Sequence, residues 1–142
     1  MCTPEINHMP PLITVAAAVI KREGRLLLGQ RPRGKRHGGL WEFPGGKLLL
    51  GETVTEAIGR ELREELDVEL DRVGPVLFRA RDPGAAFNVW FVEVAVCGTP
   101  RALEHTALKW CDRPRLLELD LAPADRQFAA EDMAVWGHRV IT

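Results

Sequence analysis

Residues 46–68 read GKLLLGETVTEAIGRELREELDV, and this stretch decides how the rest of the chain is interpreted. Its second half predicts an α-helix that begins after Thr53 and ends near Leu66. Thr53 is a good N-cap, and Glu56, three residues later, completes a capping-box pattern. Apolar residues then recur at intervals of four, which gives the helix one buried stripe (Ile58, Leu62, Leu66).

Three carboxylates share one face of this predicted helix. Glu61, Glu64 and Glu65 fall within an arc of about 100°, because residues three and four apart lie on the same side of a helix. Two interpretations of this pattern stay open. The stripe is either a solvated acidic face or a site for a hard cation such as Mg²⁺, which prefers oxygen ligands and often binds together with substrate phosphates.

The spacing of the whole stretch resembles the Nudix box, G-x5-E-x7-R-E-U-x-E-E-x-G-U, in which U is a bulky aliphatic residue. The chain matches the box from Gly46 to Val68 at every defined position except one. The exception is Asp67, where the family has a glycine that ends the helix in a left-handed conformation. Aspartate tolerates a positive φ better than most residues, so the departure concerns the helix end and not the carboxylates.

The resemblance extends beyond the box. WEFPGGK (41–47) is similar to the approach to the box in MutT-type members of the family, and EHTALKWC (104–111) and LAPAD (121–125) are similar to members that hydrolyse CTP. The similar region covers roughly residues 13–130. It implies the Nudix fold, a mixed β-sheet in an α/β/α sandwich, with residues 1–142 as a single Nudix hydrolase domain.

The resemblance also implies which residues hold a metal. Glu61, Glu64 and Glu65 match the positions of the family's magnesium ligands. The carbonyl of Gly45 and the carboxylate of Glu104 are further candidates by position. The expected cofactor is Mg²⁺, with Mn²⁺ as a substitute.

Four box residues are expected to carry the chemistry. Glu61 would bind metal and orient or deprotonate the attacking water, with Glu64 beside it. Arg60 would orient the glutamates through hydrogen bonds. Glu52 either supports the loop or contacts a water on the metal.

Three residues outside the box, Arg31, Phe87 and Asp125, are expected to meet the substrate. Arg31 matches a substrate-contacting arginine of MutT-type enzymes, and its guanidinium suits phosphate oxygens. Among the aromatic residues Phe87, Trp90 and Phe91, core packing is the first interpretation. Stacking on a base, assigned to Phe87, is the second.

Asp125 is the candidate reader of the base, because it matches an asparagine that reads 8-oxoguanine in MutT-type enzymes. The alternative role is the N-cap of the last helix. An ionised carboxylate only accepts hydrogen bonds, which fits the two adjacent donors of a guanine-type base and conflicts with the N3 acceptor of cytosine. The overall resemblance favours cytosine nucleotides instead, so the two arguments disagree.

The family resemblance implies Mg²⁺-dependent hydrolysis of a nucleoside triphosphate to monophosphate and pyrophosphate. The hydrogen-bond argument for Asp125 then favours an oxidised purine triphosphate of the 8-oxo-dGTP type, as sanitation of the nucleotide pool. CTP or dCTP is the alternative substrate, and another nucleoside diphosphate derivative is a third. A Nudix domain that binds without catalysis is disfavoured, because such domains usually lose box glutamates and Glu61, Glu64 and Glu65 are all present.

The remaining chain predicts strands on both sides of the helix. Residues 12–20 and 25–30 predict a hairpin, and 41–43 predict a short strand ended by Pro44-Gly45-Gly46. Further strands are expected near 75–80, 88–96 and 108–111, and a last helix from about Ala124 to before Gly137. The order strands, helix, strands, helix indicates an α/β or α+β sandwich.

The composition limits the partners. A formal net charge of -1 over 142 residues gives no field that would recruit a nucleic-acid polymer. Three scattered cysteines indicate neither a disulfide framework nor a zinc site. The first apolar run is too short for a membrane span and follows no basic segment, so a cytoplasmic protein is expected. The expected state is a monomer or a homodimer. Leu48–Leu50 are expected to pack either on the core or on another subunit.

Overall fold

The computed structural model describes residues 13–82 and 86–131. Strands and helices follow one another along the chain: β1 (Ile13–Arg22), β2 (Arg25–Gln30), β3 (Trp41–Glu42), β4 (Gly45–Lys47), α1 (Val54–Leu66), β5 (Glu69–Asp82), β6 (Phe87–Cys97), β7 (Ala107–Asp112) and the 3-10 helix η2 (Arg113–Glu118). A last helix begins at Pro123 and continues to residue 131, the last residue described. No helix within these ranges is long and apolar enough to cross a membrane.

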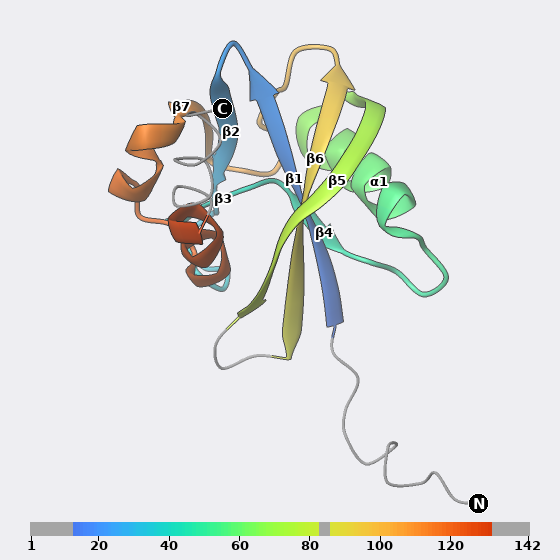
Figure 1. The fold of residues 1–142 in the computed structure, drawn as a ribbon, viewed down its shortest axis with the longest axis horizontal. Coiled ribbons are helices and arrows are strands. Elements are labelled where there is room, and N and C mark those ends of the chain that lie inside the picture. The colour runs from blue at the N-terminus through green and yellow to red at the C-terminus, as the bar shows by residue number, and fades with distance from the viewer. Residues whose placement is uncertain (1–12, 83–85, 132–142) are drawn as a thin grey trace, which may run out of the picture.

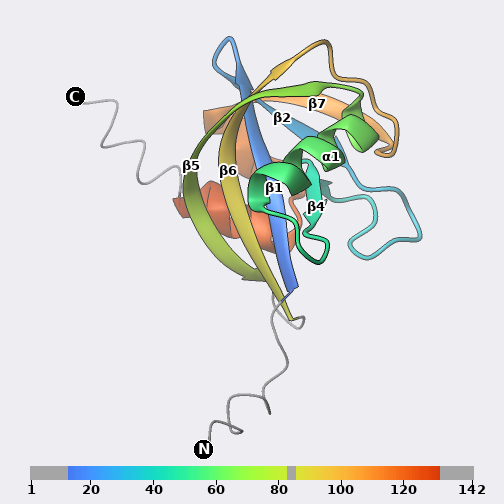
Figure 2. The same cartoon turned by 90° about the vertical axis from the view of Figure 1, so that its right-hand side faces the viewer.

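The strands form one mixed sheet in the order β3-β2-β1-β6-β5, with β4 paired to β1 and β7 paired to β2. β1 and β6 run parallel over eight residue pairs, and the other neighbours are antiparallel. Helix α1 lies on one side of the strands, and η2 and the last helix lie on the other (Figures 1 and 2). The predicted mixed sheet between helices is therefore confirmed.

Alternation along β1 divides the core into two layers. Ala16, Ala18 and Ile20 face the apolar stripe of α1, while Ala17 and Val19 belong to the opposite cluster. Strand side chains point alternately to the two faces of a sheet, so a strand buried on both faces reads as a continuous apolar run. The opposite cluster is built around the stacked rings of Phe91 and Phe128, which the Phe43 ring meets edge-on.

Helix α1 has the predicted boundaries and caps. The Thr53 side chain accepts from the Glu56 amide, and the Glu56 side chain accepts from the Thr53 amide, which is the predicted capping box. Asp67 closes the helix with φ 57° and ψ 42°, in the predicted left-handed conformation. Its amide donates to the Arg63 carbonyl, and its carboxylate pairs with Arg101.

Four sequence-based boundaries need correction. Gly45–Lys47 form strand β4 and not the end of a turn, and β5 begins at Glu69, before the predicted residue 75. The 3-10 helix η2 was not predicted. The last helix begins at Pro123, so Asp125 lies inside its first turn and is not its N-cap. The predicted end before Gly137 lies outside the described residues.

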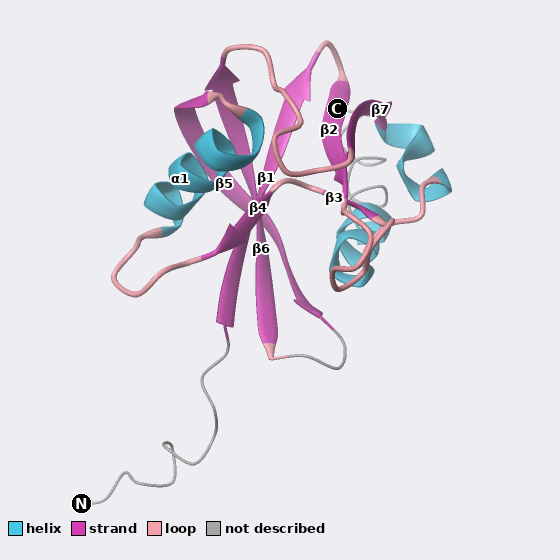
Figure 3. Ribbon diagram, turned by 180° about the vertical axis from the view of Figure 1, so that it is seen from behind, coloured by secondary structure: helices cyan, strands magenta, loops and turns pink. Residues whose placement is uncertain are grey.

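The three leucines before the box divide between core and surface. Leu48 packs against the core cluster beneath α1, whereas Leu49 and Leu50 are exposed on the loop between β4 and α1. Figure 3 shows this loop projecting beside α1.

Candidate active site

Arg60 organises the first part of the site. Its guanidinium holds Glu52 through two hydrogen bonds of 2.7 and 3.0 Å, and it also reaches Glu61 at 3.1 Å and Glu64 at 3.4 Å. A fifth bond goes to the Lys47 carbonyl in β4. The Arg60 hydrogen bonds lower the pKa of Glu52 to about 2, and Glu52 in turn raises the pKa of Arg60. Arg60 therefore ties the loop before α1 to the glutamates of the helix.

Glu61 and Glu65 form a close pair of carboxyl groups beneath β4. The Glu65 side chain is buried, and burial, followed by the hydrogen bond and charge of Glu61, raises its pKa to about 10. The Gly45 amide donates to Glu65 Oε1 at 3.3 Å. Two carboxyl groups within hydrogen-bond distance of each other are stable only when a proton or a cation lies between them.

Glycines in β4 make room for this pair. A Cβ at Gly46 would overlap the Glu61 carboxylate, and a Cβ at Gly45 would overlap the carbonyl of Ala16. Gly45 also has a φ of 148°, which side chains rarely adopt. The strand can therefore lie against both α1 and β1 only because both positions lack a side chain.

The C-terminal end of α1 brings a distant loop to the same place. The Leu103 amide donates to the Glu65 carbonyl, and the Arg101 amide donates to the Leu66 carbonyl. These two bonds satisfy carbonyls that a helix end leaves without intrahelical partners. As a result, Glu104 and His105 lie beside Glu65.

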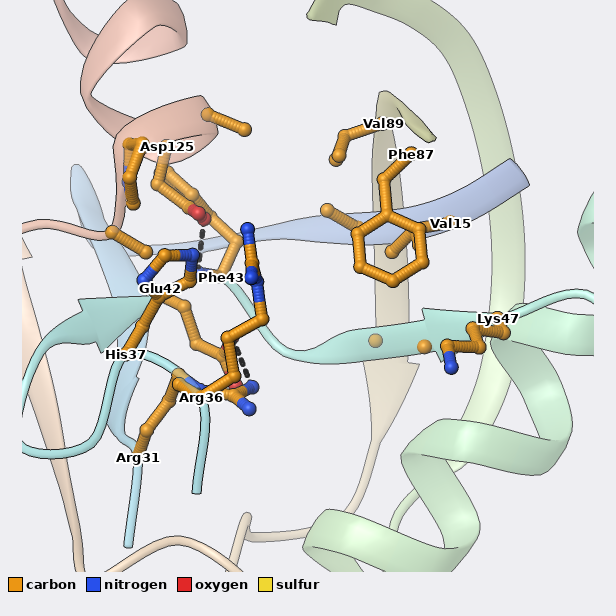
Figure 4. Close-up of a pocket in the computed structure, with 16 residues that line it drawn as sticks. Val15, Arg31, Arg36, His37, Glu42, Phe43, Lys47, Phe87, Val89 and Asp125 are labelled. Carbon is orange, nitrogen blue, oxygen red and sulfur yellow. Dashed lines mark hydrogen bonds and ion pairs between the residues drawn. The ribbon is translucent and has the colours of Figure 1, made fainter. Parts of the chain in front are cut away.

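Two cavities open next to the carboxylates. The first has a volume of about 280 Å³ and brings together Arg31, Phe87 and Asp125, the three residues predicted to meet the substrate (Figure 4). The second, of about 460 Å³, is lined by three of the predicted metal ligands, Gly45, Glu65 and Glu104. The cavities adjoin, because Arg31, Glu42 and Gly45 line both.

Asp125 lines the first cavity and is almost completely buried. Only 7% of the residue is exposed, and Asp125 Oδ2 accepts a hydrogen bond from the Phe43 amide at 2.9 Å. Burial, and then the negative charge of Glu42, raise the pKa of Asp125 well above its ordinary value. Burial therefore favours the protonated form, in which the hydroxyl donates and the carbonyl oxygen keeps a second lone pair beside the one that the Phe43 amide occupies.

Arg31 stands between the two cavities and already has carboxylate and carbonyl partners. Arg31 Nη1 lies 3.0 Å from Glu42 Oε1, and Arg31 Nε donates to the Arg36 carbonyl at 2.6 Å. These contacts fix the direction of the guanidinium of Arg31, which lines both cavities. A phosphate would therefore meet an oriented arginine.

The predicted aromatic residues separate into cavity and core. Phe87 lines the first cavity, with Lys47 Nζ 5.2 Å from its ring centre. Phe91 is fully buried in the aromatic cluster, and Trp90 lies beneath the Arg79 guanidinium at 4.3 Å. Of these three aromatic residues, only Phe87 lines either of the two cavities.

The predicted metal ligands are neighbours without yet being a closed set. Among the described residues, no three His, Cys, Asp or Glu side chains converge as ligands of one ion. Glu61 is paired with Arg60, and the Glu64 side chain is 53% exposed on the outer side of the helix. The donors themselves are carboxylate and carbonyl oxygens, which suit Mg²⁺, and the crowded Glu61–Glu65 pair gains most from a cation.

Sequence reasoning missed Glu42 and His105. Glu42 follows Trp41 in a segment that the resemblance singled out, and His105 directly follows Glu104. The contact between them, 2.9 Å from His105 Nε2 to Glu42 Oε2, joins residues 63 positions apart. The adjacency to predicted site residues was the only available signal in the sequence.

Comparison with known proteins gives a consistent result. A family model of the NUDIX domain matches residues 10–131. The CTP pyrophosphohydrolase of Escherichia coli (strain K12) is 42% identical over 117 residues, which cover 80% of this chain and 86% of that protein. A Mycobacterium tuberculosis protein (strain H37Rv) named "Putative 8-oxo-dGTP diphosphatase 2" is 38% identical over 126 residues, covering 84% of this chain and 86% of that protein.

Solved structures agree with the sequence relatives. The solution structure of the E. coli ORF135 protein has a TM-score of 0.77 at 38% identity and covers 91% of this chain and 94% of that one. The crystal structure of a MutT NUDIX hydrolase from Burkholderia pseudomallei has a TM-score of 0.74 at 31% identity, with 86% and 98% covered. Residues 10–131, which the family model matches, include the residues that line both cavities and the whole of α1.

Proposed function

The chain belongs to the Nudix family of hydrolases, and on that premise we propose that it cleaves a nucleoside triphosphate to a nucleoside monophosphate and pyrophosphate with the help of Mg²⁺. We also propose that residues 1–142 form one Nudix domain. The observation that carries the proposal is the adjoining pair of cavities. One offers an aromatic ring and a neutral carboxyl group to a base, and the other offers carboxylates to a metal-bound phosphate.

The metal would be held by oxygen ligands around the second cavity. The candidates are Glu61, Glu64 and Glu65, joined by the Gly45 carbonyl and Glu104. Bound there, Mg²⁺ would shield the phosphate charges and lower the pKa of a coordinated water. Mn²⁺ can take its place, because it accepts the same donors.

The protein's own groups would then direct the water and the substrate. Glu61 would accept the proton of the attacking water at a carboxylate oxygen, while Arg60 keeps that carboxylate in place. Arg31 would contact the phosphate chain where it passes from the first cavity to the second. The phosphoanhydride bond breaks as the water oxygen bonds to phosphorus, and pyrophosphate leaves.

The state of Asp125 narrows the choice of base. The sequence argument for a guanine-type base required an ionised carboxylate, which burial disfavours. A neutral carboxyl group donates once and accepts once, so it fits an edge with one acceptor beside one donor. 8-Oxoguanine offers O6 beside N7–H, cytosine offers N3 beside N4–H₂, and adenine has a similar edge.

On its N7 side unmodified guanine offers two acceptors, O6 and N7, so that side does not fit, although its O6 and N1–H also form an acceptor beside a donor. We therefore propose 8-oxo-dGTP, bound through its O6 and N7–H edge, as one substrate and CTP or dCTP as the second candidate. The second is favoured by the 42% identity to the E. coli CTP pyrophosphohydrolase. In the purine case dGTP is then a poor substrate, because its N7 accepts where 8-oxoguanine donates.

A substrate panel tests the proposal. kcat/KM would be measured for 8-oxo-dGTP, dGTP, CTP, dCTP, dATP, ADP-ribose and a dinucleotide polyphosphate, with separation of the products by ion exchange, in wild type and in Asp125→Ala. The expected result is a preference over dGTP that Asp125→Ala removes. An equal loss for every substrate would exclude base reading by Asp125, and a preference for ADP-ribose or a dinucleotide polyphosphate would overturn the triphosphate assignment.

A further inference from the structure

His105 lines the second cavity in an unusual environment. Its side chain is only 4% exposed, and its two ring nitrogens face two different carboxyl groups. Nε2 lies 2.9 Å from Glu42 Oε2, within hydrogen-bond distance. Nδ1 lies 4.0 Å from Glu65 Oε1 and has no hydrogen-bond partner among the described residues. A buried polar atom without a partner is costly, so this arrangement calls for an explanation.

The backbone around His105 fixes the ring on three sides. The ring lies directly on Gly29 in β2, where any Cβ would overlap it. The following residue, Thr106, donates its amide to the Gln30 carbonyl, and Leu103 is tied to the Glu65 carbonyl of α1. The ring is thus clamped between β2 and the end of α1, the element that carries the box glutamates.

The two carboxyl neighbours of the ring differ in the cavities that they line, because Glu42 lines both and Glu65 lines only the second. Glu42 pairs with Arg31, which lines the nucleotide cavity. Glu65 is the buried member of the carboxylate pair. Because a carboxylate accepts, the Nε2 atom donates to Glu42, and the Nδ1 atom lies 4.0 Å from Glu65 Oε1, the oxygen that also accepts from the Gly45 amide.

We propose that His105 is a positioning residue that aligns the nucleotide-binding pair Arg31–Glu42 with the metal-binding Glu65. The inference rests on the proposed function, since it takes Glu65 as a metal ligand and Arg31 as a substrate contact. Through one edge the ring directs Glu42, and through the other it limits where the Glu65 carboxylate can move. Loss of each edge should therefore have a different consequence.

Two conservative variants separate the two edges. In His105→Gln the amide nitrogen can take the place of Nε2, so the bond to Glu42 is kept and the Nδ1 edge is lost. In His105→Asn the amide takes the place of Nδ1, so the edge facing Glu65 is kept and the bond to Glu42 is lost. His105→Ala loses both, and Gly29→Ala displaces the intact ring.

One binding measurement, the affinity for Mn²⁺, accompanies the kinetics. Mn²⁺ affinity would be measured on the nucleotide-free protein from the EPR signal of free Mn²⁺, and KM and kcat would be measured with the preferred triphosphate. We expect His105→Gln to weaken Mn²⁺ binding roughly tenfold with KM nearly unchanged, and His105→Asn to raise KM roughly tenfold with Mn²⁺ binding nearly unchanged. Gly29→Ala should show both effects. Gly59→Ala, whose Cβ would make only an ordinary contact with Leu70, is the matched control and should behave as wild type.

The outcomes are distinguishable. Wild-type Mn²⁺ affinity and KM in both His105→Ala and Gly29→Ala would overturn the inference. An equal loss of both quantities in His105→Gln and His105→Asn, following the fall in melting temperature, would make His105 a packing residue and also overturn it. A wild-type protein that neither binds Mn²⁺ nor hydrolyses any triphosphate would instead overturn the proposed function.

Discussion

Replacing Asp125 by asparagine should make the protein's stability less sensitive to pH. Asparagine reproduces the neutral acid, because its carbonyl can accept from the Phe43 amide while its NH₂ group faces the cavity as a donor. In the wild type, the folded protein keeps the Asp125 proton above the ordinary pKa of 3.8, while the unfolded chain releases it. The unfolded state then binds fewer protons, so the wild type loses stability as the pH rises.

The magnitude follows from linkage. Between about pH 4 and the raised pKa of folded Asp125, each pH unit costs the wild type up to about 1.4 kcal/mol, and Asp125→Asn avoids this cost. The group is almost completely buried, so solvent screening reduces the effect little. The pKa of Glu65 is also raised, but Glu65 is present in both proteins and its contribution cancels in the difference.

Urea denaturation at pH 5, 6, 7 and 8 gives the free energy of unfolding of both proteins. The difference, variant minus wild type, should increase with pH, and Asp125→Asn should keep the preference of 8-oxo-dGTP or CTP over dGTP. A difference that is constant from pH 5 to pH 8 would refute the neutral carboxyl group. So would a variant that prefers dGTP, because the wild-type carboxyl group would then have acted as an acceptor only.

The remaining predictions concern the carboxylate helix. Excess EDTA should abolish hydrolysis and added Mg²⁺ should restore it; undiminished turnover in EDTA would contradict a metal-dependent reaction. Glu61→Gln should lower kcat by about 10²–10⁴-fold. The control Glu56→Gln keeps the capping box and should leave kcat unchanged. A folded Glu61→Gln protein with more than a tenth of wild-type kcat would assign the activation of water to another residue. Gly46→Ala should push the Glu61 carboxylate aside and lower kcat with the fold retained, as seen by circular dichroism, while Gly59→Ala leaves kcat unchanged.

Local patterns predicted the parts of the fold that are determined locally. The capping box, the apolar stripe and the left-handed Asp67 depend on residues within a few positions of one another, and all three are confirmed. Strand β4 was missed because Pro44-Gly45-Gly46 has the composition of a turn. The glycines are there for another reason, since they let β4 approach Ala16 and Glu61, and no local pattern reveals that contact.

The site shows the same division between local and distant contacts. Position in the box suggested Arg60 as the organiser of the glutamates, and its hydrogen bonds to Glu52, Glu61 and Glu64 agree with that prediction. Glu42 and His105 escaped notice because their roles depend on a contact across 63 residues. The raised pKa of Asp125 escaped as well, because it depends on burial and on the charge of Glu42.

One short segment links the two halves of the site. The Phe43 amide donates to Asp125, which lines the first cavity, and two residues later the Gly45 amide donates to Glu65 among the carboxylates. The Phe43 ring is anchored in the aromatic cluster, and Gly45 is held against β1, so neither amide can shift freely. The distance from the group that would read the base to the group that would hold the metal is therefore set by a single rigid stretch of backbone. A substrate whose cleaved phosphate lies at a different distance from its base would satisfy only one of the two carboxyl groups, which gives this site a physical reason to select by length as well as by base edge.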